Sequence, residues 1–323
     1  MTTPIQLELP TPYSIGPVSS VNAWLFTEPE PTLIDCGLKT EESRLALEAG
    51  LAQQGLKLED IRHVVITHAH EDHSGLARII TERSEAQVWV SDVAYDWCVN
   101  LPTLWEERMR FFGDILHKAG QPTENRERIW QGRNRSLDEW ESIPAERITR
   151  FPIDGVLEFG GAQWRSLYAP GHTYTQTCFY QLGTKQLFSA DMLLKVTPVA
   201  VIEQYPDRPQ ERIPGLLQFV ESMKKFQTLD VSTVYPGHGE AFTDHTKLIQ
   251  WQLRSIVERK EQCLGLVREG YRTPYEISEV MYSHYPKGAR FTGFAMTIGY
   301  LDLLMSEGLV ERQERNGIWD FKG

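Results

Sequence analysis

Apolar and polar positions follow two different spacings along the first 90 residues of the chain. Short apolar runs bounded by turn residues predict strands, at residues 21–26, 32–35, 62–67 and 87–91. Between these runs, apolar positions three and four residues apart predict helices, at residues 41–54 and from residue 74 onward. Strands that alternate with helices are typical of an α/β fold built in layers, and we expect that class of fold.

Residues 93–147 interrupt this alternation. Aromatic and aliphatic residues recur there at helical intervals among charged residues, and a turn follows at residues 120–125. One interpretation is a helical hairpin that packs on the sheet, which we favour for most of the aromatic residues. The other is a lid that forms one wall of a substrate pocket, because long inserted segments often carry binding residues.

Strands return in the second half of the chain and are followed by a second unit. Apolar runs predict strands at residues 156–159, 164–168, 178–182, 186–189 and 231–235, with a helix at residues 212–226. Helical spacing follows at residues 246–268, 274–282 and 295–306, and a hairpin over residues 309–321 turns at Asn316-Gly317. We therefore expect two domains, residues 1–240 and 241–323, the second with the helix–helix–hairpin order of a winged-helix module.

Composition and net charge limit the kinds of binding partner and the cellular compartment that we expect. With 33 Lys and Arg against 44 Asp and Glu, the net charge of −11 disfavours long-range attraction to nucleic acid or to an anionic membrane. The four cysteines are widely spaced, which is typical of reduced thiols. The first residues lack the pattern of a signal peptide, and no apolar run reaches membrane-spanning length. We expect a soluble cytoplasmic protein without a membrane partner.

The segment directly after the strand at 62–67 is dense in metal-binding side chains. It contains His68, His70, Asp72 and His73 within six residues. Imidazole and carboxylate groups are the ligands that borderline divalent metals prefer, and the end of a strand in an α/β fold is where ligands usually bind. Three further candidates each stand beside small residues or Pro and Gly near the end of a predicted strand: His172, Asp191 and His238.

These seven residues, in this order, resemble the pattern of the metallo-β-lactamase-fold hydrolases, and most of all that of their glyoxalase-II-like branch. The resemblance covers roughly residues 15–240 and implies a four-layer αββα sandwich, with residues 93–147 as a helical insertion. The unit at 241–323 is similar to the winged-helix-like extension of relatives of β-lactamase-like protein 2. The long insertion and the lack of an evident glutathione-binding basic cluster depart from glyoxalase II itself.

The resemblance also implies which ligands bind which metal ion. One divalent ion would be held by His68, His70 and His172. A second would be held by Asp72, His73 and His238, with Asp191 bridging the two ions. Asp72, Asp191 and His238 would then be the catalytic residues, around a hydroxide shared by the metals. Zn²⁺ fits these donors best, and they also suit Fe²⁺ and Mn²⁺.

Outside the ligand set, Asp35 matches a family carboxylate that braces the metal loop, and a turn cap is its alternative role. Tyr174, Lys287 and Arg290 are candidate contacts to a small-molecule acyl substrate. The C-terminal unit mixes acidic and basic residues, so nucleic acid is the less favoured partner. We expect that unit to pack beside the active site or to form a homodimer contact.

The function predicted from these residues is metal-dependent hydrolysis of a thioester or a related acyl ester. Three alternatives remain open at this point. The same two-metal centre can cleave a phosphodiester such as RNA. A single iron held by His68, His172 and Asp191 would give a persulfide dioxygenase. The third alternative is the opening of a lactone, which is chemically close to the hydrolysis of an acyl ester.

Overall fold

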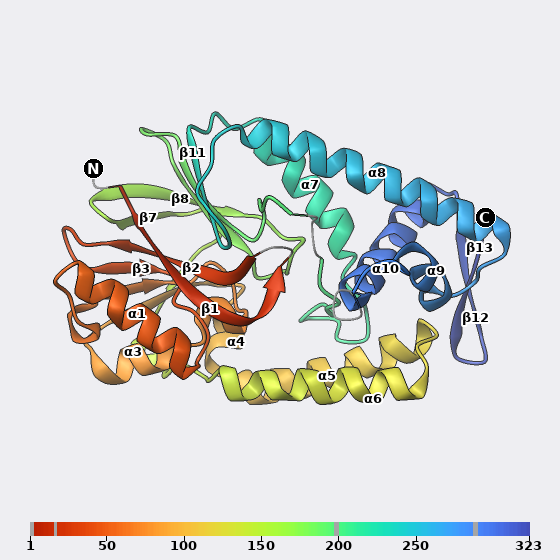
Figure 1. The fold of residues 1–323 in the computed structure, drawn as a ribbon, viewed down its shortest axis with the longest axis horizontal. Coiled ribbons are helices and arrows are strands. Elements are labelled where there is room, and N and C mark those ends of the chain that lie inside the picture. The colour runs from red at the N-terminus through yellow and green to blue at the C-terminus, as the bar shows by residue number, and fades with distance from the viewer. Residues whose placement is uncertain (1–2, 16–17, 197–199, 287–289) are drawn as a thin grey trace.

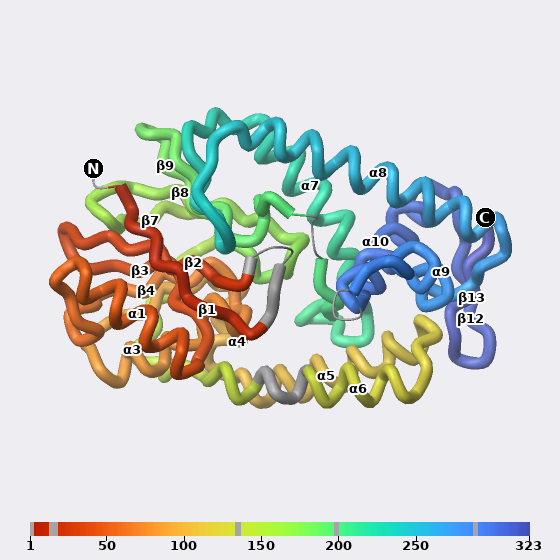
Figure 2. The backbone as a smooth tube through the Cα atoms, in the orientation of Figure 1, coloured from red at the N-terminus to blue at the C-terminus, as the bar shows by residue number. Residues whose placement is uncertain are grey.

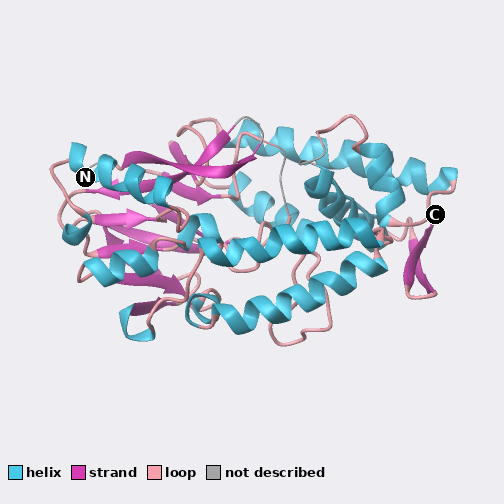
Figure 3. Cartoon of the chain, turned by 60° about the horizontal axis from the view of Figure 1, so that its bottom comes forward, coloured by secondary structure: helices cyan, strands magenta, loops and turns pink. Residues whose placement is uncertain are grey.

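The computed structural model describes residues 3–15, 18–196, 200–286 and 290–323. Two β-sheets lie face to face at the N-terminal end of the molecule, and helices gather at the other end (Figure 3). The two termini lie at opposite ends of this elongated shape (Figure 2). The α/β class and the layered arrangement of the sandwich expected from the sequence are confirmed.

Six strands form the first sheet, in the order of the chain. They are β1 (Ile5–Ile15), β2 (Val18–Phe26), β3 (Thr32–Ile34), β4 (His63–Val65), β5 (Gln87–Ser91) and β6 (Ile148–Phe151). The first three strands are antiparallel, and β3 to β6 are parallel. The strands predicted at residues 21–26 and 32–35 correspond to β2 and β3, which pair antiparallel.

Five strands form the second sheet, in the order β11-β10-β9-β8-β7. They are β7 (Val156–Phe159), β8 (Ala162–Tyr168), β9 (Thr177–Gln181), β10 (Gln186–Ala190) and β11 (Thr233–Pro236). All pairs are antiparallel except β10 with β11, which are parallel. Both β10 and β11 therefore end at the same edge of the sheet.

An aromatic layer holds the two sheets together. Phe26 of the first sheet contacts Phe188 of the second with ring centroids 6.0 Å apart, and Trp164 lies 4.9 Å from Phe188. At the edge of this layer, the Trp24 Nε1 donates to the carbonyl of Pro236 at 3.0 Å. Such close-packed aromatic contacts fix the separation of the sheets, and with it the separation of the loops that leave them.

Helices cover the outer faces of the sandwich (Figure 1). On the first sheet lie α1 (Glu41–Gln53), the short α2 (Glu71–Ser74) and α3 (Ala77–Arg83). The first of these begins at Thr40, whose side chain accepts a hydrogen bond from the Ser43 N–H at 3.2 Å, an N-cap that satisfies an otherwise free donor. On the side of the second sheet lies α7 (Gly215–Gln227).

The inserted segment forms a helical hairpin that leaves the sandwich. It consists of α4 (Tyr95–Val99), α5 (Leu101–Lys118), α6 (Thr123–Asn134) and two short 3-10 turns, η2 (Arg135–Glu139) and η3 (Ala145–Arg147). The hairpin was expected. Helix α4 packs on β5 of the first sheet as expected, whereas α5 extends away from the sheet and reaches the C-terminal unit (Figure 1). There Phe112 contacts Phe291 with ring centroids 5.7 Å apart.

The described residues of the C-terminal unit form three helices and a hairpin. They are α8 (His245–Glu269), α9 (Pro274–Met281), α10 (Arg290–Ser306), β12 (Glu311–Arg315) and β13 (Ile318–Lys322). Helix α10 is buried over most of its length between α7, α8 and α9. Among the described residues, no helix has both the length and the apolar character that crossing a bilayer requires. The domain division at residue 240 stays a prediction.

Candidate metal centre

All seven predicted ligands converge at one edge of the sandwich. His68, His70, Asp72 and His73 follow β4 of the first sheet, around the start of α2. The other three come from the second sheet, where His172 follows β8, Asp191 follows β10 and His238 follows β11. The centre therefore lies where strands of both sheets end, and its dimensions depend on how the sheets pack.

Three imidazoles form the first group of donors. The Nδ1 of His70 lies 3.0 Å from Nε2 of His68 and 3.1 Å from Nε2 of His172. Burial, followed by the neighbouring imidazoles, lowers the pKa of His68 and of His70 well below the usual value. Both rings are therefore neutral, which is the form that binds a metal ion.

A carboxylate and two imidazoles form the second group. The Nε2 of His238 lies 3.4 Å from Oδ2 of Asp72, and the Nε2 of His73 lies 3.8 Å from Oδ1 of the same carboxylate. Burial acts to lower the pKa of His238, but the carboxylates of Asp191 and Asp72 outweigh it and raise that pKa to about 10. The negative potential at this position attracts a positive charge, whether a proton or a metal cation.

Asp191 lies between the two groups. Its Oδ1 is 3.4 Å from Nε2 of His73, and its Oδ2 is 3.4 Å from Nε2 of His238 and 3.5 Å from Nε2 of His172. One carboxylate thus contacts donors of both groups, which is the position required of a bridging ligand.

The hydrogen bonds around the centre fit a divalent metal ion. Within the described part of the chain, His73 Nε2, His238 Nε2 and Asp191 Oδ1 are buried atoms without a hydrogen-bond partner. The other ring nitrogens are occupied, because His73 Nδ1 lies 2.7 Å from Asp35 Oδ2 and His238 Nδ1 lies 2.6 Å from the Ser20 carbonyl. Both outer nitrogens must donate, so in the neutral ring that binds a metal ion the Nε2 lone pairs are directed at the centre. Buried polar atoms left without a partner are costly, and a cation would satisfy all three.

Asp35 supports the metal loop from behind. Its Oδ1 accepts from the Thr67 N–H at 2.8 Å, and its Oδ2 accepts from the Thr67 hydroxyl at 2.8 Å and from His73 Nδ1 at 2.7 Å. Two roles were expected for Asp35, and these contacts favour support of the metal loop over capping of a turn. Asp35 also has a left-handed backbone, with φ of 60°.

We expect Asp35→Asn to weaken metal binding by about 10- to 100-fold, because an amide nitrogen would face the His73 Nδ1–H and turn the ring or its tautomer. Competition with a chromogenic chelator measures the affinity. Asp244→Asn is a matched control, since Asp244 has the same left-handed backbone, with φ of 59°, on the exposed start of α8. An unchanged affinity in Asp35→Asn would assign this carboxylate to the turn alone.

The three candidate substrate contacts have different surroundings. Tyr174 lies two residues beyond His172, and its hydroxyl accepts a hydrogen bond from the Trp97 Nε1 at 2.6 Å. The Arg290 guanidinium donates to the Ser283 carbonyl at 2.7 Å, at the start of α10. Lys287 lies outside the described residues. The roles of all three in substrate binding stay predictions.

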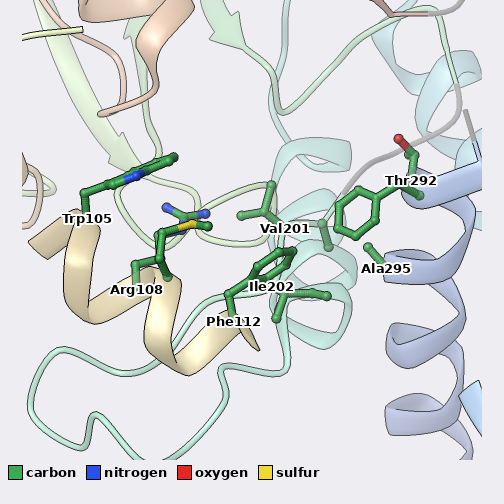
Figure 4. Close-up of a pocket in the computed structure, with 10 residues that line it drawn as sticks. Trp105, Arg108, Phe112, Val201, Ile202, Thr292 and Ala295 are labelled. Atoms are coloured by element: carbon green, nitrogen blue, oxygen red, sulfur yellow. The ribbon is translucent and has the colours of Figure 1, made fainter. Parts of the chain in front are cut away.

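Two cavities adjoin the backbone around His172. The larger, of about 420 Å³, has aromatic and acidic walls that include Trp97, Tyr168, Tyr174, Glu107 and Glu203. The smaller, of about 60 Å³, lies between α5 and α10 (Figure 4). Arg108 lines both cavities. Helix α5 forms part of the wall of both cavities, and the lid interpretation of the insertion stays a prediction.

Two further residues, not predicted from the sequence, are Arg108, which lines both cavities, and Glu203, which lines the larger. Glu203 is buried and accepts from the Thr173 hydroxyl at 2.8 Å and from the Tyr174 N–H at 2.9 Å. It also forms an ion pair of 3.2 Å with Arg108. An acidic residue after the apolar pair Val201-Ile202 was an available signal for a buried carboxylate, whereas Arg108 looked like any charged residue on a helix.

Comparison with known proteins places the chain in a family. The family model described as Metallo-beta-lactamase superfamily matches residues 16–238. Probable metallo-hydrolase YqjP of Bacillus subtilis is 27% identical over 305 residues, which are 94% of this chain and 92% of that protein. An atrochrysone carboxyl ACP thioesterase of Aspergillus fumigatus is 26% identical over 149 residues, which are 42% of this chain and 43% of that protein.

A solved structure agrees over the whole length. A metallo-beta-lactamase family protein from Thermus thermophilus superimposes with a TM-score of 0.81 at 25% identity, covering 99% of this chain and 98% of that one. Its coverage includes the helical insertion and the C-terminal unit. The finer assignment to the glyoxalase-II-like branch stays a prediction. From the family match, the shared fold and the ligand set together, the chain belongs to the metallo-beta-lactamase superfamily.

Proposed function

We propose that this protein hydrolyses a thioester or a related acyl ester with two divalent metal ions, of which Zn²⁺ fits the donors best. The observation that carries the proposal is the contact of Asp191 with donors of both groups. His68, His70 and His172 would hold one ion, and Asp72, His73 and His238 the other. Two such ions would lower the pKa of a shared water and polarise a carbonyl oxygen.

The side chains of the centre contribute orientation and charge. The imidazoles of His238 and His73 outweigh the effect of burial and lower the pKa of Asp191 well below its usual value. Asp191 is therefore ionised, which is the form in which a carboxylate can bridge two cations. In the reaction, the water oxygen bonds to the acyl carbon, the carbon–sulfur bond breaks and a proton of the water passes to the sulfur. The products are a carboxylic acid and a thiol.

The side chains that line the larger cavity favour the binding of a small uncharged or cationic group over that of a polyanion. Carboxylates of Asp92, Asp96, Glu107 and Asp207 line it, and the one guanidinium in its wall, Arg108, is already paired with Glu203. A phosphodiester backbone would be repelled by this lining. Its volume of about 420 Å³ is within the range of small-molecule sites. The names of the Bacillus and Aspergillus relatives agree with hydrolysis and with a thioester substrate.

The test is a metal-reconstitution assay on the full chain. We expect the chelator-treated protein to lose thioester hydrolysis and to regain it as Zn²⁺ is added to about two equivalents. Fe²⁺ and Mn²⁺ are added in parallel, and lactones and phosphodiesters are assayed beside the thioesters, with thiol release and O₂ uptake recorded. Hydrolysis that survives complete metal removal, or O₂ uptake that requires a single iron, would contradict the proposal.

A further inference from the structure

The smaller cavity is enclosed by the insertion on one side and by the C-terminal unit on the other. Figure 4 shows Trp105, Arg108 and Phe112 reaching from α5 toward Ile202 and Ala295. Eight of the ten described residues in its walls are of apolar type, and the other two are Arg108 and Thr292. A volume of about 60 Å³ corresponds to roughly four to six water-sized groups, because each needs about 10–15 Å³ by this measure.

Two sets of contacts place this cavity beside the loop that carries His172. The N–H of Val201, which lines the cavity, donates to the carbonyl of His172 at 3.0 Å. Arg108, which also lines it, is paired at 3.2 Å with Glu203, and Glu203 accepts from the Thr173 hydroxyl and the Tyr174 N–H. The cavity therefore lies behind the segment that positions the His172 imidazole.

The two cavities differ in chemistry and meet at Arg108. Glu203 holds the Arg108 guanidinium at 3.2 Å, and that guanidinium lies 5.3 Å above the Trp97 ring, so its position is fixed on two sides. The larger cavity has carboxylate and phenol groups in its walls, whereas no carboxylate is among the described residues that line the smaller. A scissile carbonyl at the centre has an acyl group on one side and a leaving group on the other. An apolar acyl chain fits the smaller cavity better, because in the larger one it would take carboxylates out of water.

We propose that the smaller cavity is the acyl-binding site and that it selects short apolar acyl groups of about four to six carbons. This inference rests on the proposed hydrolysis of acyl esters and names the acyl half of the substrate. It also gives the C-terminal unit a function, because α10 forms the wall that limits the length of the chain. The larger cavity receives the polar leaving group.

Two side chains set the length of the site. Ala295 presents the small side chain of α10 to the cavity, and Phe112 lines the opposite wall on α5, in ring contact with Phe291 at 5.7 Å. A larger residue at 295 shortens the space, and a smaller residue at 112 lengthens it. Each methylene that enters an apolar site improves kcat/KM by about fourfold until the wall is reached.

The experiment is a series of thioesters with one thiol and straight acyl chains of increasing length. For the wild-type protein we expect kcat/KM to rise about fourfold per carbon, to peak near four to six carbons and then to fall. Ala295→Leu is expected to shorten the optimum by about two to three carbons, and Phe112→Ala to lengthen it. Ser306→Leu, at the exposed end of α10, is the control and should leave the optimum unchanged.

A binding series separates this inference from the proposed reaction. Straight-chain alkyl hydroxamates bind metal ions without being hydrolysed, and their affinity for the Zn²⁺-loaded protein should show the same length optimum and the same opposite shifts in the two variants. Selective hydroxamate binding without thioester hydrolysis would overturn the reaction and support the cavity. Hydrolysis or binding that is independent of chain length, or optima that do not move in either variant, would overturn the acyl site.

Discussion

Asp191→Ala is expected to lower kcat by on the order of 10³-fold and to remove at least one bound metal ion. The reason is its position, since its carboxylate lies 3.4–3.5 Å from nitrogen atoms of His73, His172 and His238. Among the described residues, no other carboxylate has its oxygen atoms within 4 Å of histidine nitrogens from both groups. Steady-state kinetics and metal content per protein measure the two effects.

A comparison within the ligand set sharpens this expectation. His238→Ala removes a donor from the second group alone, so we expect it to lose one ion and keep the other. Thermal unfolding with and without added metal shows whether either variant has lost its fold, because a ligand that binds the native state raises the unfolding temperature. An Asp191→Ala protein that retains two ions and the kcat of the wild type would exclude the bridging role.

The ligand residues could be predicted from the sequence, because each stands where an apolar run ends beside Gly, Pro or another small residue. That His172, Asp191 and His238 lie together could also be expected, since β8, β10 and β11 belong to one sheet. The distances from these three residues to His68 and His70 could not be predicted. They depend on the aromatic layer between two sheets, in which contacts such as that of Phe26 with Phe188 join residues far apart in the chain.

The missed elements have physical explanations as well. Strand β1 contains Pro10 and Pro12, which the sequence rules count against a strand. It nevertheless forms because it is the edge strand of the first sheet, where a missing N–H can face solvent. For α5, the apolar stripe with Trp105 and Phe112 predicted burial correctly. An apolar stripe does not specify its partner, and the partner is α10 rather than the sheet.

Gly237→Ala is the second change with a large expected effect, although Gly237 is not itself a ligand. A Cβ at this position would lie 2.2 Å from Oδ1 of Asp191 and 2.8 Å from Cε1 of His73. We expect kcat to fall by on the order of 10²-fold, because displacing a catalytic group by about 1 Å costs that much, and metal affinity to fall with it. Kinetics and chelator competition measure both quantities.

The control for this substitution is Gly265→Ala on α8, where an added Cβ would meet no atom within 4 Å. Alanine is preferred over glycine inside a helix, so we expect this variant to be more stable by about 0.5–1 kcal/mol and fully active. Equal losses of kcat in the two variants would assign the effect of Gly237→Ala to something other than the clash at the centre.

The backbone at Gly237 decides which atoms must move. Its N–H donates to the Ala190 carbonyl at 2.9 Å, and its own carbonyl accepts from the Asn22 N–H at 2.7 Å, so the segment is held from both sheets. Its φ lies outside the left-handed region, so alanine fits the local conformation and the strain falls on the neighbours. Because the backbone is fixed and the Asp191 carboxylate can rotate, the added methyl group should displace that carboxylate. Metal affinity and kcat that both remain at the wild-type level would mean that this carboxylate oxygen is not needed at the position it occupies.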